Sequence, residues 1–190
     1  MKKVLIDLTI LKHLNCGLGQ IAYNYAKYWG ENARNMEFEV WFLVPEQYVG
    51  AFGDDVRYLK VSPLYEISGI FMPRFDVWHS IHQLCRFMPS RRSTANLLTV
   101  HDINFIYEKS GFSLKKHIRK FNKRLNRADK VVFISNFAKD DVLSHFGLNK
   151  PNEVVYNGVE FGNPADERHH DLPFAPDRKF IFSIGQIREK

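Results

Sequence analysis

The chain has 190 residues, which is enough for one complete domain with a buried core and too few for two. Apolar residues make up 45% of the sequence and charged residues 25%, a balance that excludes an intrinsically disordered chain. The net charge of +6 indicates an anionic partner, for which phosphate groups, a nucleic acid and a membrane surface are all candidates.

The two cysteines, Cys16 and Cys85, have no CxxC spacing and are expected to be reduced thiols of a cytoplasmic protein. The apolar run at the N-terminus is interrupted by Asp7, so we expect a strand there rather than a signal peptide. No window approaches 18 uninterrupted apolar residues, and we therefore expect no membrane-spanning segment.

Short apolar runs, separated by polar or amphipathic stretches, are predicted to be strands. They are residues 4–8, 38–44, 56–61, 77–79, 97–100, 130–134 and 153–156. Helical spacing is predicted after the first strand, where Gly30 and the polar residues after it should end the helix, and over 114–125. A third helix should begin at Ser135 or Asn136 and stop at Gly147. Alternating strands and helices predict an α/β fold, a Rossmann-like doubly wound parallel sheet.

The organisation of the chain changes after residue 161. We expect one Rossmann-like domain over residues 1–161 and a linker over 162–178, which holds three prolines and a pair of histidines. Residues 179–190 are predicted to be a new strand and a turn at Gly185. A strand entering a βα unit needs what comes next to cover its faces, so we expect the chain to be a fragment of a longer protein, truncated as a second domain begins.

Ligands of parallel α/β sheets bind beyond the carboxyl ends of the strands, which draws attention to Gly17-Leu18-Gly19. Two glycines at the start of a helix let backbone N–H groups approach a phosphate. With Ala22 the loop also fits a loose dinucleotide-binding fingerprint, although it lies well beyond its strand. A tight turn that merely starts the helix is the alternative.

His101 and Asp102 directly follow the strand at 97–100. A histidine there can donate a hydrogen bond to a phosphate or a sugar hydroxyl, with its orientation set by the neighbouring carboxylate. The alternative is a structural histidine satisfied by the backbone. His79 and His82 raise the possibility of a metal site with this pair, but their spacing is weak support, and we expect no metal.

These motifs form an ordered set: the glycine loop, TVHD, FISNFAKDD, VVYNGVE and FSIGQIREK. In this order and spacing the sequence resembles the retaining GT-B glycosyltransferases of family four, particularly the bacterial mannosyltransferase-like members. The resemblance covers nearly the whole chain. It departs from the family pattern at Cys16, where a glycine is usual, and at Gln186, where arginine or threonine is common.

The resemblance implies roles for residues at the matching positions. Gly17, Leu18 and Gly19 would lie near the phosphates of the donor, and His101 with Asp102 near the transferred sugar. Gly185, Arg188 and Lys190 would open the donor-binding domain and hold the diphosphate. No cofactor is implied, since the donor is a nucleotide diphospho-sugar substrate.

The implied function is transfer of a hexose, with mannose as a family-level preference, to a glycan or glycolipid acceptor with retention of configuration. The isolated chain would be inactive because it lacks the donor-binding half. One rival is an NAD-dependent oxidoreductase, which should carry an acidic residue at the end of the second strand, where Val44-Pro45 stands before Glu46. The other rival, a basic non-enzymatic nucleic-acid-binding module, lacks a recognisable recognition motif. We therefore expect no nucleic-acid partner.

The helix predicted over 114–125 carries a cluster of cations on and beyond it. They are Lys115, Lys116, Arg119, Lys120, Lys123, Arg124, Arg127 and Lys130. An apolar stripe on the same helix should pack on the sheet and leave these cations outward. We expect Lys120, Lys123, Arg124 and Arg127 to hold the enzyme on an anionic membrane, peripherally on its inner face, close to a lipid-linked acceptor. A solvated basic face without a partner is the alternative.

Overall fold

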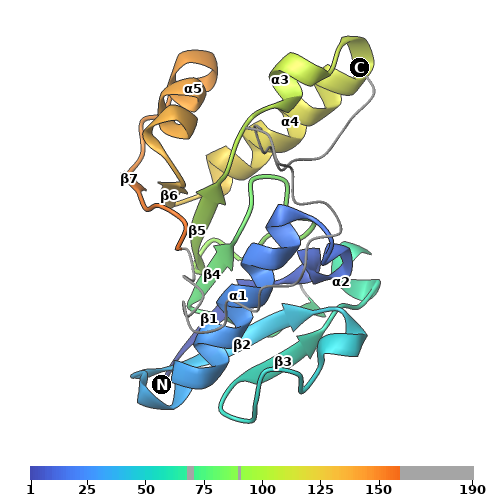
Figure 1. Cartoon of the computed structure of the whole chain (residues 1–190), viewed down its shortest axis with the longest axis vertical. Helices are drawn as coiled ribbons and strands as arrows, with labels where there is room; N and C mark the ends of the chain where they lie inside the picture. Colours follow the sequence, from blue (N-terminus) through green and yellow to red (C-terminus); the bar gives the residue numbers. More distant parts are fainter. Residues whose placement is uncertain (68–70, 90, 159–190) are drawn as a thin grey trace, which may run out of the picture. The chain divides into compact units, whose positions relative to one another are not determined.

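A computed structural model describes residues 1–67, 71–89 and 91–158 (Figure 1). The chain divides into two compact units, Met1–Asn157 and Gly158–Lys190, and the described residues lie almost entirely in the first. The expected linker at 162–178, the expected strand that follows it, and Gly185, Arg188 and Lys190 are outside the described residues.

The first unit is built on a seven-stranded sheet in the order β3-β2-β1-β4-β5-β6-β7. Every pair of neighbouring strands is parallel, which confirms the predicted Rossmann-like α/β fold. The strands are β1 (Lys2–Asp7), β2 (Phe38–Val44), β3 (Arg57–Lys60), β4 (Val77–Ser80), β5 (Ala95–Val100), β6 (Lys130–Phe133) and β7 (Asn152–Val154). Each strand predicted within the described residues exists, with ends that differ by at most about two residues, because apolar runs bounded by polar residues mark buried parallel strands well.

The helices between the strands include three long ones, and all three were predicted. The α-helices are α1 (Gly17–Asn32), α2 (Leu64–Ile67), α3 (Phe105–Glu108), α4 (Gly111–Arg127) and α5 (Asn136–Phe146), with 3₁₀ turns η1 (Thr9–His13), η2 (Ala33–Asn35) and η3 (Glu46–Tyr48). Ser135 caps α5, because its hydroxyl accepts a hydrogen bond from the Ala138 N–H at 3.1 Å. Gly147 ends α5 with a φ of 61°, as expected of a glycine after a helix.

The first helix is predicted to end at Gly30 and the polar residues after it, and α1 ends within that stretch, at Asn32. A Cβ added at position 30 would lie 2.1 Å from the Phe52 carbonyl oxygen. Gly30 therefore lets α1 approach the chain after η3 closely. In the sequence alone, such a glycine cannot be distinguished from one that ends a helix.

Helices cover both faces of the sheet (Figure 1). The α1 helix packs on a core cluster that includes Ile6, Val40 and Phe42. On the other face, α4 buries Phe121 and Leu125 against a cluster that includes Leu98 and Val100 of β5 and residues of β6. The predicted apolar stripe of α4 is confirmed by these contacts, since partly buried residues of the same stripe pack on this cluster.

Candidate functional site

The sheet has its topological switch point between β1 and β4, where the strand order reverses. Crevices at the carboxyl ends of strands flanking such a point are the usual ligand sites of doubly wound sheets. Here β1 ends at the buried Asp7, and β4 continues into a loop of residues 81–85, which we call the β4 loop. The neighbouring strand β5 ends directly before His101. The candidate site is built from these three strand ends.

The imidazole of His101 is buried and its Nε2 lies 2.9 Å from the carbonyl oxygen of Ile81. A carbonyl only accepts, so Nε2 carries the hydrogen, and in the neutral ring the lone pair is on Nδ1. Burial lowers the pKa of His101, opposed by the Ile81 hydrogen bond and the charge of Asp102. At neutral pH the ring is therefore an uncharged Nε2–H tautomer whose remaining ring nitrogen can only accept a hydrogen bond.

The expectation that Asp102 orients the His101 ring is wrong, because the ring is held by the Ile81 carbonyl. The Asp102 Oδ1 atom instead accepts from the Asn104 N–H at 3.2 Å and from the Gln83 amide at 3.2 Å. The alternative was a structural histidine whose ring is hydrogen-bonded to the backbone. This holds for Nε2, which donates to the Ile81 carbonyl, and it leaves Nδ1 able to accept a hydrogen bond from a ligand.

Gln83 is a site residue that the sequence did not predict. Its side chain is 5% exposed and bridges the β4 loop to the end of β5, since the His101 N–H donates to its Oε1 at 3.1 Å. The sequence could point to Gln83 only through its position, because it directly follows His79 and His82 at the end of β4.

His79 and His82 do not join His101 in a metal site. The Nε2 of His79 lies 2.9 Å from the Thr99 hydroxyl, and the Nδ1 of His82 accepts from the Leu84 N–H at 3.3 Å. Burial, with a smaller contribution from His101, lowers the pKa of each to about 4. Within residues 1–67, 71–89 and 91–158, no group of three or more histidine, cysteine or acidic side chains is placed to hold a metal ion.

The predicted glycine loop lies at the start of α1, with Gly17 as the first helical residue. A Cβ at Gly19 would lie 2.1 Å from the His13 carbonyl oxygen, so this glycine is required for η1 to pack against α1. Gly17 has nothing within 4 Å of such a Cβ, and the Cys16 side chain does not cap the helix. Close packing against η1 therefore explains the glycine at position 19 without a bound phosphate. Phosphate contacts of Gly17-Leu18-Gly19 remain an expectation.

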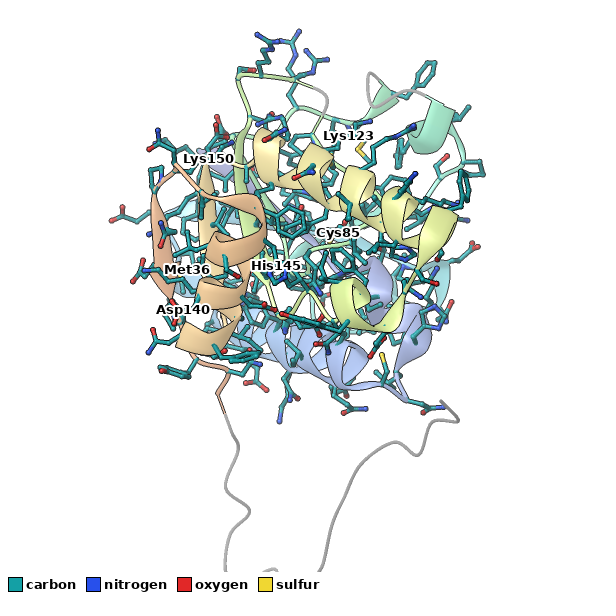
Figure 2. The ribbon with its side chains drawn as sticks, turned by 90° about the horizontal axis from the view of Figure 1, so that it is seen from above. Met36, Cys85, Lys123, Asp140, His145 and Lys150 are labelled. Carbon is teal, nitrogen blue, oxygen red and sulfur yellow. The ribbon has the colours of Figure 1, made fainter. Side chains whose placement is uncertain are left out.

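Behind the candidate site, the side chains of Asp7, Cys85 and Arg124 are buried together. Burial raises the pKa of Asp7 to about 6, although hydrogen bonds from Thr9 and the nearby Cys85 and Arg124 oppose it. Burial also raises the pKa of the Cys85 thiol, which keeps it protonated. Figure 2 labels Cys85 near the middle of the molecule and Lys123 closer to its edge.

The expectation that the cations of α4 all point outward is wrong for Arg124, which is 6% exposed. Its Nε donates to the Cys85 carbonyl oxygen at 2.6 Å, and its Nη1 donates to the Lys120 carbonyl oxygen at 3.1 Å. Position 124 falls on the inner arc of the helix between Phe121 and Leu125, so its stem follows the apolar stripe inward.

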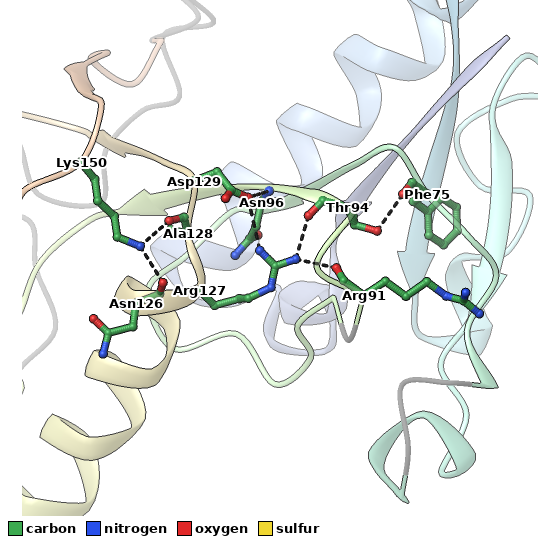
Figure 3. Close-up of polar contacts among 9 residues, drawn as sticks. All are labelled: Phe75, Arg91, Thr94, Asn96, Asn126, Arg127, Ala128, Asp129 and Lys150. Carbon is green, nitrogen blue, oxygen red and sulfur yellow. Dashed lines mark hydrogen bonds and ion pairs between the residues drawn. The ribbon is translucent and has the colours of Figure 1, made fainter.

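Arg127 is also engaged by the protein, as Figure 3 shows. Its Nη2 donates to the carbonyl oxygens of Arg91 and Thr94, each at 2.7 Å, and its Nη1 lies 3.3 Å from Asp129 Oδ2. Arg127 therefore fixes the chain that enters β5 and is not free to face a membrane. Lys120 and Lys123 remain on the exposed side of α4, as expected.

Lys120 is partly buried and has other cations close to it. Its pKa is lowered first by partial burial and then by the charges of Arg124, Lys116 and Lys12. Lys12 belongs to η1, the segment before the glycine loop, so η1 and α4 bring cations toward each other near the carboxyl ends of the strands.

A seven-stranded parallel sheet with a switch point between β1 and β4 places the chain among the Rossmann-like α/β proteins, whose ligands usually bind at the carboxyl ends of the strands. The family model of Glycosyltransferase Family 4 matches residues 31–162, well over half of the sequence. The chain belongs to this glycosyltransferase family, which confirms the family seen in the motifs. No individual curated protein shows significant similarity to it. Among the described residues, none of the helices is long and apolar enough to cross a bilayer.

Proposed function

We propose that the chain is the acceptor-side half of a retaining GT-B hexosyltransferase. The enzyme transfers a sugar, with mannose as the first candidate, from a nucleotide diphospho-sugar to a hydroxyl of a glycan or glycolipid. A second α/β half, opened by Gly185 with Arg188 and Lys190, holds the diphosphate, and residues 1–190 alone turn over no donor. Membership of Glycosyltransferase Family 4 supports transfer in general.

The observation that carries the proposal is the contact between His101 Nε2 and the Ile81 carbonyl oxygen at the end of β5, which assigns the hydrogen of the ring to Nε2. A neutral imidazole with a bare Nδ1 accepts a hydrogen bond from a sugar hydroxyl without adding positive charge beside an oxocarbenium-like centre. Charge on the leaving diphosphate is then left to the glycine-loop amides and to cations of the donor-binding half. The end of β2 also favours sugar transfer over hydride transfer, since Val44-Pro45 stands where an acidic residue would hold a ribose, and Glu46 beyond it is paired with Lys60.

The test separates the two ring nitrogens of His101 in the enzyme that includes the donor-binding half. His101→Gln keeps an amide donor near the position of Nε2, so it can still reach the Ile81 carbonyl, but it removes the Nδ1 acceptor. We expect this variant to fold normally and to lose about 10²-fold or more in kcat with nucleotide-sugar donors. His101→Asn, which can replace Nδ1 but not Nε2, is the matched control and should lose stability.

Full activity in folded His101→Gln would make the histidine purely structural and remove it from the mechanism. Donors are screened as UDP-, GDP- and ADP-linked hexoses, with release of the nucleotide diphosphate as the signal. Turnover of a nucleotide-sugar donor by residues 1–190 alone would contradict the proposal that a second half is needed to bind the donor.

We further propose that the exposed side of α4 docks on an anionic membrane surface, where a lipid-linked acceptor is found. Phe112 is 84% exposed in the first turn of α4. Lys116, Arg119 and Lys123 follow it at spacings of four, three and four, so they share its face of the helix. The cations of this face attract an anionic surface, and the exposed ring of Phe112 can enter the headgroup region, while the apolar face of α4 stays packed on the sheet.

The membrane proposal is tested by co-sedimentation with vesicles of varied phosphatidylserine content and salt. Each cation near an anionic bilayer contributes about 1 kcal/mol, so reversing three of them should lower the partition coefficient by at least 100-fold. The variant reverses Lys116, Arg119 and Lys123 to Glu. The control reverses Lys2, Lys27 and Arg57, which are exposed on other elements and give the same net charge. Equal loss in both variants would make binding a matter of net charge and not of α4.

A further inference from the structure

We propose that Gln83 is a positioning residue of the reacting centre: its side-chain amide joins the backbone of His101 to the carboxylate of Asp102. Its meaning for catalysis rests on the proposed sugar transfer. Both ends of the amide are used, since Oε1 accepts from the His101 N–H at 3.1 Å and Nε2 donates to Asp102 Oδ1 at 3.2 Å.

The orientation of the amide is fixed by its partners. A backbone N–H only donates and a carboxylate only accepts, so Oε1 must face His101 and Nε2 must face Asp102. Turning the amide over would place two donors face to face and two acceptors face to face. The side chain is 5% exposed, so water cannot easily replace either partner.

The β4 loop that carries Gln83 is held on both sides. The Ile81 carbonyl accepts from His101 Nε2, and the Cys85 carbonyl accepts from Arg124 Nε at 2.6 Å. The Cys85 N–H in turn donates to the His82 carbonyl at 3.3 Å. Gln83 therefore projects from a short segment that is fixed to the end of β5 at one end and to α4 at the other, as a positioning group requires.

Loss of this bridge acts on two groups at once. Without an acceptor, the buried His101 N–H has no partner, and without the amide donor one hydrogen bond to the Asp102 carboxylate is lost. A displacement of about 1 Å at a reacting centre can cost about 10²-fold in rate. We expect Gln83→Met to lower kcat by 10- to 100-fold while the KM for the donor changes less than threefold.

Two substitutions separate the two hydrogen bonds. Gln83→Glu keeps an oxygen acceptor for the His101 N–H and loses the donor to Asp102, whereas Gln83→Met loses both. Gln47→Glu introduces the same charge at an exposed position of η3 and serves as the control.

The first measurement needs no substrate and uses the 190-residue chain. Hydrogen exchange of the His101 amide should be at least tenfold faster in Gln83→Met, and close to wild type in Gln83→Glu and Gln47→Glu. Gln83 and Ile81 belong to the same loop, so loss of the bridge should also loosen the hydrogen bond between the His101 ring and the Ile81 carbonyl. The ¹⁵N spectrum of the ring should therefore show the Nε2–H tautomer in the wild type and an averaged signal in Gln83→Met. Unchanged exchange and an unchanged ring spectrum in folded Gln83→Met would overturn the positioning role.

The second measurement is the pH dependence of sugar transfer in the enzyme with its donor-binding half. In Gln83→Glu two carboxyl groups face each other, so the pair binds a proton more readily than an isolated carboxyl group and the shared proton restores a hydrogen bond. The activity of this variant relative to wild type should rise at least threefold from pH 8 to pH 6. A constant ratio would overturn the claim that the bond to Asp102 matters. A wild-type enzyme that transfers no sugar would refute the proposed function, and the exchange measurement would still decide whether Gln83 positions His101.

Discussion

The ionised carboxyl group of Asp7 should lower the stability of the first unit at neutral pH, a cost that disappears in acid, and comparison with Asp7→Asn isolates this contribution. The side chain is 1% exposed, and its Oδ2 has no hydrogen-bond partner, while Oδ1 accepts from the Thr9 N–H at 3.0 Å. Burial raises the pKa from 3.8 to about 6 in the folded chain. An acid with a raised pKa favours the folded state when protonated, so its contribution is lost as the pH rises through about 6.

The size of the effect follows from the two pKa values. The difference between 3.8 and about 6 corresponds to about 3 kcal/mol of stability that is present below pH 3.8 and absent above about pH 7. Between pH 8 and pH 5 the wild type should recover about 1.4 kcal/mol of it. Asparagine keeps the oxygen that accepts from Thr9 and cannot ionise, so Asp7→Asn should be more stable than wild type at pH 8 and lose this advantage on acidification.

The assay is thermal and urea unfolding of both proteins at pH 8 and pH 5. The difference in melting temperature should shrink by about 3–6 °C between the two pH values for a chain of this length. Comparing the two proteins at each pH cancels the buried histidines, which are common to both. Asp140→Asn, at an exposed position of α5, controls for removal of a carboxylate. A difference in melting temperature between wild type and Asp7→Asn that stays constant, or that grows toward pH 5, would refute the argument that burial raises the pKa of Asp7.

Three further predictions concern packing, capping and acid stability. Gly19→Ala should destabilise the first unit by more than the usual helical benefit of alanine, since its Cβ would meet the His13 carbonyl at 2.1 Å, and urea unfolding should show a lower midpoint. Ser135→Ala should cost about 1 kcal/mol of unfolding free energy by removing the cap of α5, whereas Ser135→Asp should retain most of it. His79 and His82 have folded pKa values near 4 and unfolded values near 6.5, so stability should fall as the pH drops from 6.5 toward 4, and His79→Gln should weaken that slope in acid titrations followed by circular dichroism.

The sequence predicts the central strands well because they are short apolar runs with buried residues on both faces, as in β2 from Phe38 to Val44. It predicts the position of His101 for the same reason, since the end of a strand is visible in the sequence. It could not predict Gln83, because a lone glutamine after a strand has no pattern until the loop folds back on β5. Glycines are ambiguous in the same way, since Gly19 and Gly30 satisfy close approaches that only the fold creates.

The two neighbouring cations Lys123 and Arg124 show how much of a charge cluster the sequence alone can assign. Both belong to one basic stretch of α4, yet Lys123 is exposed and Arg124 is 6% exposed. Arg124 binds the Cys85 carbonyl of the β4 loop and lies close to the Asp7 carboxylate, so it stabilises the segment that carries Gln83.

Substituting each of the two with methionine separates surface attachment from the structure of the site. Lys123→Met should change the free energy of unfolding by less than about 0.5 kcal/mol and lower vesicle partitioning about fivefold. Arg124→Met should cost about 3 kcal/mol of unfolding free energy, because it leaves buried carbonyls and the Asp7 carboxylate without their cation. It should also speed exchange of the His101 amide, which Lys123→Met should not affect. If Arg124→Met instead weakened vesicle binding and left His101 exchange unchanged, Arg124 would belong to the membrane surface, and the β4 loop would have to be held by other contacts.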